Sequence, residues 1–193
     1  MRSKILATLG ALALLGSASC SPAPTITDAT LGFTIVEGLL LLDSSRPTIG
    51  TVVLAGTGGT CILLQKGYSF TQIASSDFLT FYLESVGPNL GFLPLTAGTY
   101  AVQIPSDTGA TSAGMYAAAN EWETDGACNE IPTGANSGSV TIEPFSLDAG
   151  ESSSVNYTVV FGTARFTGAY GLTTCIQPAG TQAVDAGSCT PPP

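Results

Sequence analysis

The 193-residue sequence contains no histidine and only five lysine or arginine residues. Histidine is the commonest general base in enzymes, so its absence removes every Ser-His and Cys-His nucleophile pair. It also removes a usual zinc ligand, and no two cysteines are spaced closely enough for a zinc knuckle. The scarcity of basic side chains disfavours nucleic-acid binding, which depends on neutralising phosphate. We therefore expect no zinc cofactor and no nucleic-acid partner.

The N-terminal apolar stretch is short. Residues 5–15 carry no charge, follow Arg2 and Lys4, and precede the small residues 16–19. These are the parts of a secretory signal. Eleven residues fall short of the roughly twenty that a membrane-spanning helix needs. We predict that residues 1–19 are a signal peptide that is removed after export.

The stretch LLGSASC, which ends at Cys20, resembles a bacterial lipobox, with Ser17 where leucine is usual. The resemblance implies that Cys20 receives a diacylglycerol and becomes the new amino terminus. Ser21 follows the cysteine where aspartate would retain a lipoprotein, which implies sorting to the outer membrane, on its periplasmic face or its surface. The alternative is an ordinary signal peptidase cut beside Ser19, which leaves Cys20 unmodified.

Removal of the signal peptide leaves three basic residues against fourteen acidic ones, a net charge of −11. It also leaves Cys61, Cys128, Cys175 and Cys189 besides the lipidated cysteine. An even set of cysteines in an oxidising envelope predicts two disulfides. Three pairings exist. We favour Cys175 with Cys189, which closes a short loop at the C-terminus, and Cys61 with Cys128.

The chain beyond the signal peptide divides into three parts. Residues 20–30 are small and polar, which predicts a flexible tether. Residues 31–176 contain short apolar runs of period two separated by turn residues, which predicts one all-β domain. Residues 177–193 are polar and end in three prolines, so we expect a surface tail held by Cys189. The fold class predicted is a β-sandwich or small barrel of about eight antiparallel strands.

The clearest predicted strand is 78–84, and the alternation recurs at Val155, Tyr157, Val159 and Phe161. Evidence for helices is thin, because the apolar run 39–42 is too short and 115–122 allows at most two turns. The glycine-rich segment 56–60 lacks the P-loop and dinucleotide patterns and predicts a hairpin turn. Further predicted strands are residues 33–36, 51–54, 61–64, 100–104, 140–142 and 165–170.

Two features suggest nucleophilic or acid catalysis. Lys66 precedes Ser69 in the reverse of the S-x-x-K order, which favours a solvated lysine in a turn. The sequence DTGAT from Asp107 resembles the active-site loop of aspartic proteases, and Val160-Phe161-Gly162 resembles the apolar residues that support it. A single triplet would require a symmetric dimer to supply the second carboxylate. The alternative is an ordinary turn after a strand.

An acidic segment surrounds the only tryptophan, Trp122. Its oxygens suit calcium, although Pro132 stands where an EF-hand needs glutamate. Two of its carboxylates could serve as acid and base on a glycoside, with Trp122 stacking on the sugar. The alternative is a solvated acidic loop whose tryptophan packs on a disulfide. The four carboxylates are Glu121, Glu123, Asp125 and Glu130.

Residues 137–175 resemble the C-terminal half of short lipoproteins predicted in myxobacteria, in which a Gly-x-Val-Thr-Ile strand leads through Phe-Gly and Thr-Gly to a cysteine. The resemblance implies a β-meander and an envelope location, and it carries no activity over to this chain. Upstream, Thr60-Cys61 and Gly98-Thr99-Tyr100 fit the same pattern. The matching positions are Gly138, Val140, Thr141, Ile142, Phe161, Gly162, Thr167, Gly168 and Cys175.

The leading hypothesis is a non-catalytic, lipid-anchored interaction or structural module of the envelope, with no metal and no cofactor. An envelope protein or a glycan is the kind of partner considered, and the sequence names neither. One alternative is a hydrolase that uses Asp107 in a dimer or the carboxylates of the acidic segment. The other is a module that binds calcium or carbohydrate through residues 121–130.

Overall fold

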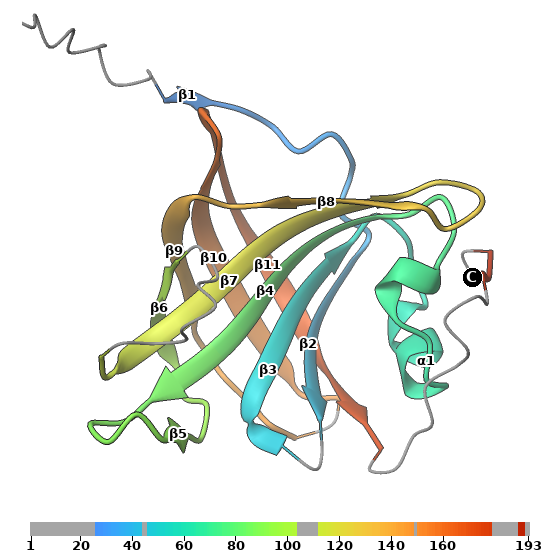
Figure 1. Cartoon of the computed structure of the whole chain (residues 1–193). Helices are drawn as coiled ribbons and strands as arrows, with labels where there is room; N and C mark the ends of the chain where they lie inside the picture. The colour runs from blue at the N-terminus through green and yellow to red at the C-terminus, as the bar shows by residue number, and fades with distance from the viewer. Residues whose placement is uncertain (1–25, 44–45, 104–111, 149, 179–188, 192–193) are drawn as a thin grey trace, which may run out of the picture.

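The computed structural model of the chain describes residues 26–43, 46–103, 112–148, 150–178 and 189–191 (Figure 1). The predicted signal peptide, Cys20 and Asp107 lie outside these residues. The elements are β1 Thr27–Asp28, β2 Glu37–Asp43, β3 Arg46–Ala55, α1 Thr60–Gln65, the 3-10 helix η1 Phe70–Gln72, β4 Asp77–Val86, β5 Phe92–Leu93, β6 Gly98–Val102, β7 Gly114–Thr124, β8 Glu130–Gly134, β9 Ser137–Ile142, β10 Ser152–Phe161 and β11 Ala164–Gln177.

Eight of the strands close into a barrel. Around the circle they run β2, β3, β4, β7, β6, β9, β10 and β11, which pairs again with β2. Neighbouring strands are antiparallel except at two seams, β6 with β7 and β2 with β11, where they are parallel. The all-β prediction is confirmed. Of the two predicted architectures, a β-sandwich or a small barrel, the structure is a barrel. The prediction of a purely antiparallel sheet is wrong, because the first and last barrel strands of the chain meet in parallel.

The barrel interior is filled by the apolar residues of the alternating runs. Strands β4 and β10 contribute Leu79, Phe81 and Leu83, and Val155, Tyr157, Val159 and Phe161. Gly138 allows β9 to lie close to β10: its φ is +144°, and a Cβ there would stand 2.2 Å from the Thr158 carbonyl oxygen. This glycine of the Gly-x-Val-Thr-Ile pattern is therefore needed for the shape of the backbone.

Helix α1 lies outside the barrel (Figure 1). A second apolar cluster, which we call the outer cluster, joins residues of α1 and the segment after η1 to the outer side of the barrel strands. Within α1, Leu64 is buried while Ile62 is exposed, so the helix is amphipathic. The predictions of a strand at 61–64 and a hairpin turn at 56–60 are wrong, because short apolar runs do not distinguish strand from helix. Here Gly59 turns the chain with φ 71°, and Glu37 Oε2 accepts the Thr60 N–H at 2.7 Å at the start of α1. The outer cluster consists of Leu39, Val53, Ala55, Leu64, Ile73, Phe78 and Cys175, with Leu41, Cys61, Leu63, Phe70 and Trp122 packed against it.

Residues 115–122 and 39–42, where the evidence for a helix was thin, lie in β7 and β2. Two other segments differ from expectation. Residues 33–36 were predicted to form a strand, but they have no strand partner and run over the end of the barrel (Figure 1). Thr27 and Asp28, within the predicted tether, pair with Ala164 and Arg165 of β11. No helix in the described part of the chain is long and apolar enough to cross a membrane.

Four cysteines form two disulfides, as predicted, but the favoured pairing is wrong. Cys61 pairs with Cys175, and Cys128 pairs with Cys189. The parallel seam places the end of β11 beside α1, which brings together two cysteines 114 residues apart. The predicted tail is held near the β7–β8 turn through Cys189, and Thr190 exchanges backbone hydrogen bonds with Gln72 and Ala74.

Candidate functional site

The best candidate for a binding site lies at one end of the barrel, beneath residues 29–36, which we call the strap. The strap runs from β1 across the barrel end to β2 (Figure 1). Backbone hydrogen bonds hold both of its ends: Ala29 N–H donates to the Arg165 carbonyl, and Val36 N–H donates to the Ala55 carbonyl. The strap is therefore a fixed part of the fold and forms a roof over the barrel end.

The strap alternates between buried and exposed side chains. Leu31, Phe33 and Ile35 are half-buried and pack against the barrel core, whereas Thr34 and Val36 are exposed. The period-two pattern that predicted a strand here is real, but it reflects packing on the barrel end.

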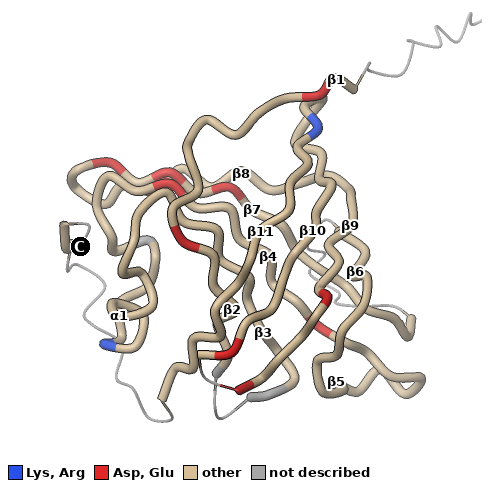
Figure 2. The backbone as a smooth tube through the Cα atoms, turned by 180° about the vertical axis from the view of Figure 1, so that it is seen from behind, with Lys and Arg blue, Asp and Glu red and all other residues tan. Residues whose placement is uncertain are grey.

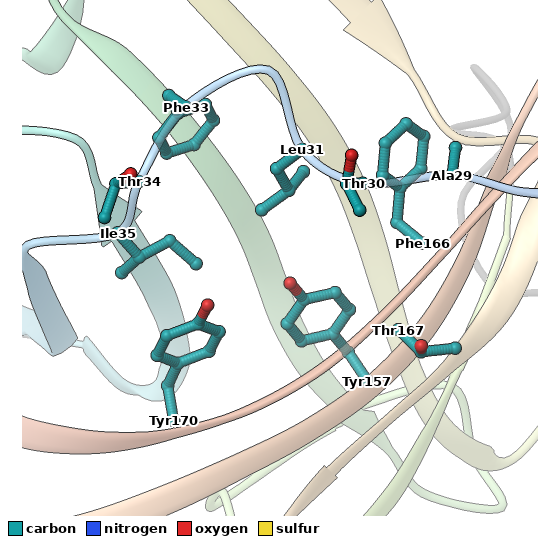
Figure 3. A pocket seen from close by; sticks show the side chains of 10 residues that line it. All are labelled: Ala29, Thr30, Leu31, Phe33, Thr34, Ile35, Tyr157, Phe166, Thr167 and Tyr170. Carbon is teal, nitrogen blue, oxygen red and sulfur yellow. The ribbon is translucent and has the colours of Figure 1, made fainter.

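A pocket of about 410 Å³ lies between the strap and the barrel wall, and we call it the tyrosine pocket (Figure 3). The strap supplies its roof, and strands β10 and β11 supply its opposite wall. No Asp, Glu, Lys or Arg lines it. Its lining residues are Ala29, Thr30, Leu31, Phe33, Thr34, Ile35, Tyr157, Phe166, Thr167 and Tyr170.

Tyr157 is the central polar residue of this pocket. It is 5 % exposed, and its ring lies 5.3 Å from the Phe81 ring, centroid to centroid. It also lies across from Gly168, where a Cβ would stand 2.6 Å from the tyrosine oxygen. Glycine at position 168 therefore makes room for the phenol, whose hydroxyl reaches the pocket (Figure 3). Burial, together with the nearby Tyr170, raises the pKa of Tyr157 to about 12.

A second pocket, of about 370 Å³, lies on the other side of Phe33, and we call it the acidic pocket. Asp77 and Glu123 are directly opposed in the β4–β7 pair, and Glu121 is two residues away on the same face of β7. Like charges placed across a strand pair repel. Burial raises the pKa of Glu121, and the charges of Asp77 and Glu123 raise it further. The pocket is lined by Gly32, Phe33, Asp77, Glu121, Trp122, Glu123, Ile131 and Thr133.

The four carboxylates predicted to act together do not converge. Glu121 and Glu123 lie on the face of β7 that lines the barrel interior, with Ala117 and Ala119. Glu130 pairs with Thr124, so alternation places both on the outer face. Acidic residues do gather along β7, β8 and their turn (Figure 2). Among the described residues, no group of three or more His, Cys, Asp or Glu side chains is placed to hold a metal ion.

Asp125 is occupied by its own turn. Its carboxylate accepts the N–H groups of Ala127 and Asn129 at 2.8 and 2.9 Å, and the Asn129 side-chain amide at 2.7 Å. These hydrogen bonds, above all those from Asn129, lower the pKa of Asp125. The residue shapes the β7–β8 turn beside Cys128.

Trp122 packs on the outside of the barrel. Its indole N–H donates to Thr80 Oγ1 at 2.9 Å, and its ring lies 5.6 Å from the Phe70 ring. The residue belongs to the outer cluster, which also contains Cys175. The indole is therefore partly covered by the outer cluster, and its role in sugar stacking stays a prediction.

The remaining candidates do not form a site in the described part of the chain. Asp107 lies outside it, so the aspartic-protease hypothesis stays a prediction. Lys66 lies in the turn after α1, and Ser69 caps η1 together with Gln72.

The sequence pattern placed Tyr157 in the core but did not indicate that it lines a pocket. The signal available was the alternation of Leu31, Phe33 and Ile35, which marks a segment packed on the barrel.

No protein-family model, no curated protein and no solved structure matches this chain. The function must therefore be argued from its own residues.

Proposed function

We propose that this chain is an exported lipoprotein of the bacterial cell envelope, anchored through Cys20, that serves there as a non-catalytic interaction or structural module. The observation that carries the proposal is the state of the cysteines. Four of the five are engaged in two disulfides within the fold. Disulfides are typical of oxidising compartments outside the cytoplasm. Cys20 alone is left for another chemistry, and it follows a signal-like stretch.

The position of β1 is compatible with the anchor. Thr27, where the described fold begins to pair, is seven residues from Cys20. Seven residues span at most about 25 Å even when fully extended. An acylated Cys20 would therefore keep the barrel close to the membrane, with the strapped end nearest to it.

The barrel itself supports a structural or binding role. Its interior is filled by side chains from the strands that enclose it, which leaves the strapped end and the outer surface for contacts. We propose that an envelope protein or a glycan contacts these surfaces.

Palmitate labelling tests the anchor. The wild-type chain is expected to incorporate radiolabelled palmitate and to partition into the detergent phase of Triton X-114. Cys20→Ser should lose both properties, because a hydroxyl does not replace the thiol that receives the lipid. Ser21→Ala is the matched control and should retain both. Label that persists in Cys20→Ser would contradict the proposal.

A further inference from the structure

The tyrosine pocket has the size and walls of a small-molecule site. Its volume of about 410 Å³ falls within the roughly 300–1,000 Å³ usual for ligand pockets. Four of its lining side chains are large and apolar: Leu31, Phe33 and Ile35 from the strap, and Phe166 from β11. Ligand pockets typically combine such walls with a few well-placed polar groups.

The Tyr157 hydroxyl is the polar group that lacks a partner. It has no hydrogen bond within the described part of the chain, although the residue is 5 % exposed. Every fully buried side-chain nitrogen or oxygen of the described residues does have a partner. The Tyr157 oxygen is therefore open to the pocket, where its hydroxyl points (Figure 3). A hydroxyl in such a pocket donates to water when the pocket is empty, and a ligand with an acceptor can take the place of that water.

The surroundings fix the chemistry of the ligand. No charged side chain lines the pocket, so nothing there would compensate for burying an ion. The Tyr170 hydroxyl also faces the pocket and lies close enough to influence Tyr157 electrostatically (Figure 3). Thr30, Thr34, Thr167 and the two tyrosines add polar surface to the apolar walls. A ligand that fits is therefore uncharged and has both an apolar and a polar part.

We propose that the tyrosine pocket binds a small, neutral, partly apolar molecule through a carbonyl or similar acceptor that receives the hydrogen bond of Tyr157. The apolar body lies among Leu31, Phe33, Ile35 and Phe166, and the polar end points to the barrel wall. The strap forms a preformed roof, because both of its ends are hydrogen-bonded to strands. This proposal does not depend on the membrane anchor.

Fluorescence of N-phenyl-1-naphthylamine, a neutral apolar probe, tests whether the pocket binds. The full chain is used with Cys20→Ser, so that no acyl group competes with the probe. Saturable binding of one probe per chain is expected. Ala29→Trp places a large side chain into the pocket from the half-buried face of the strap and should weaken probe binding at least about tenfold. Unchanged far-UV circular dichroism and melting temperature show that this variant folds.

Competition by a matched pair of compounds tests the role of Tyr157. 2-Acetylnaphthalene and 2-ethylnaphthalene have nearly the same shape, and only the first has a carbonyl. Tyr157→Phe removes the hydroxyl and keeps the ring, so it should weaken the ketone about three- to tenfold, as expected for one lost hydrogen bond. The hydrocarbon should change less than about twofold. Tyr82→Phe makes the same change on β4, away from the pocket lining, and should alter neither affinity.

Three results would overturn the proposal. One is the absence of saturable probe binding to the folded chain. Another is undiminished binding in the folded Ala29→Trp variant, which would place the probe elsewhere on the surface. The third is equal weakening, or none, of the ketone and the hydrocarbon in Tyr157→Phe, which would remove the hydroxyl from recognition.

Discussion

Among the described residues, Glu121 is the one whose negative charge most clearly destabilises the folded state. Burial, Asp77 and Glu123 all raise its pKa above the usual value of 4.5, so the folded state favours the protonated carboxyl. A group of this kind contributes its full stability below its unfolded pKa, and the contribution is lost as the pH rises through its folded pKa. At pH 7, the ionised Glu121 should therefore weaken the fold.

Glu121→Gln should raise the melting temperature at pH 7 by about 1–3 °C. The change is small because Glu121 is only half-buried, so solvent screens the repulsion. The gain should shrink as the pH falls below about 4, where the wild-type carboxyl is itself neutral. Thermal unfolding of both proteins from pH 3.5 to pH 7 measures it.

Glu151→Gln, at an exposed glutamate before β10, is the control and should show no pH-dependent gain. A Glu121→Gln variant that melts below the wild type at pH 7 would mean that the carboxylate makes a favourable contact in solution.

The roles of individual residues were predictable where alternation decides them. The core positions of β4 and β10 follow from the period of two, because successive side chains of a strand face opposite sides. The acidic segment was misjudged because it was read as one loop. Its carboxylates instead occupy two faces of the β7–β8 hairpin and its turn. Asp77, which completes the acidic pocket, lies 44 positions before Glu121 and gives no local signal.

At the scale of elements, the disulfides determine how α1 and the C-terminal segment are held. Cys61 attaches α1 to the end of β11, and Cys175 is 1 % exposed within the outer cluster. Crosslinks that close long loops restrict the unfolded chain most. The bond between Cys61 and Cys175 spans 114 residues, so it should contribute strongly to stability.

The double variant Cys61→Ala/Cys175→Ala should lose about 4–5 kcal/mol of unfolding free energy, as the chain-entropy relation gives for such a loop. Guanidinium unfolding monitored by circular dichroism measures the loss. The single variant Cys61→Ala tests the pairing directly. After unfolding without reductant, Cys175 should react with iodoacetamide, while Cys128 and Cys189 should remain oxidised.

Cys128→Ala is the matched control and should leave Cys189 reactive instead. Alkylation of Cys128 in the Cys61→Ala variant would contradict the pairing and would support the one that the sequence had favoured.

Elements with sustained alternation were predictable, whereas short ones were not. The strands β4, β9, β10 and β11 contain the residue ranges that were predicted for them, because apolar and polar side chains alternate along each of these runs. The helix α1 has six residues, fewer than two turns, so its apolar run satisfies either period. Its first N–H donates to Glu37, a residue of β2 that is distant in sequence and gives no local signal. The strap likewise has the pattern of a strand without a strand partner.

At the scale of the whole molecule, the two parallel seams are the feature that no local pattern indicates. The seam between β2 and β11 pairs Leu39 with Thr173 and joins the first barrel strand to the last. Sequence patterns report which residues face a core, but they do not report which strands are neighbours. The all-β class and the approximate strand number were therefore predictable, and the closed mixed barrel was not.

Closure of the barrel has a measurable consequence for hydrogen exchange. In a closed barrel, the backbone amides at the β2–β11 seam are paired on both sides and should exchange only through global unfolding. Strands β1, β5 and β8 lie outside the circle and pair with a single neighbour each. Peptides from β2 and β11 should therefore be protected as strongly as those from β3 and β4, and β5 and β8 should exchange faster.

Exchange monitored by mass spectrometry after peptic digestion resolves these segments. Early exchange of β2 and β11 together, with β3 and β4 still protected, would show that the parallel seam opens in solution and that the barrel is a curled sheet with two free edges.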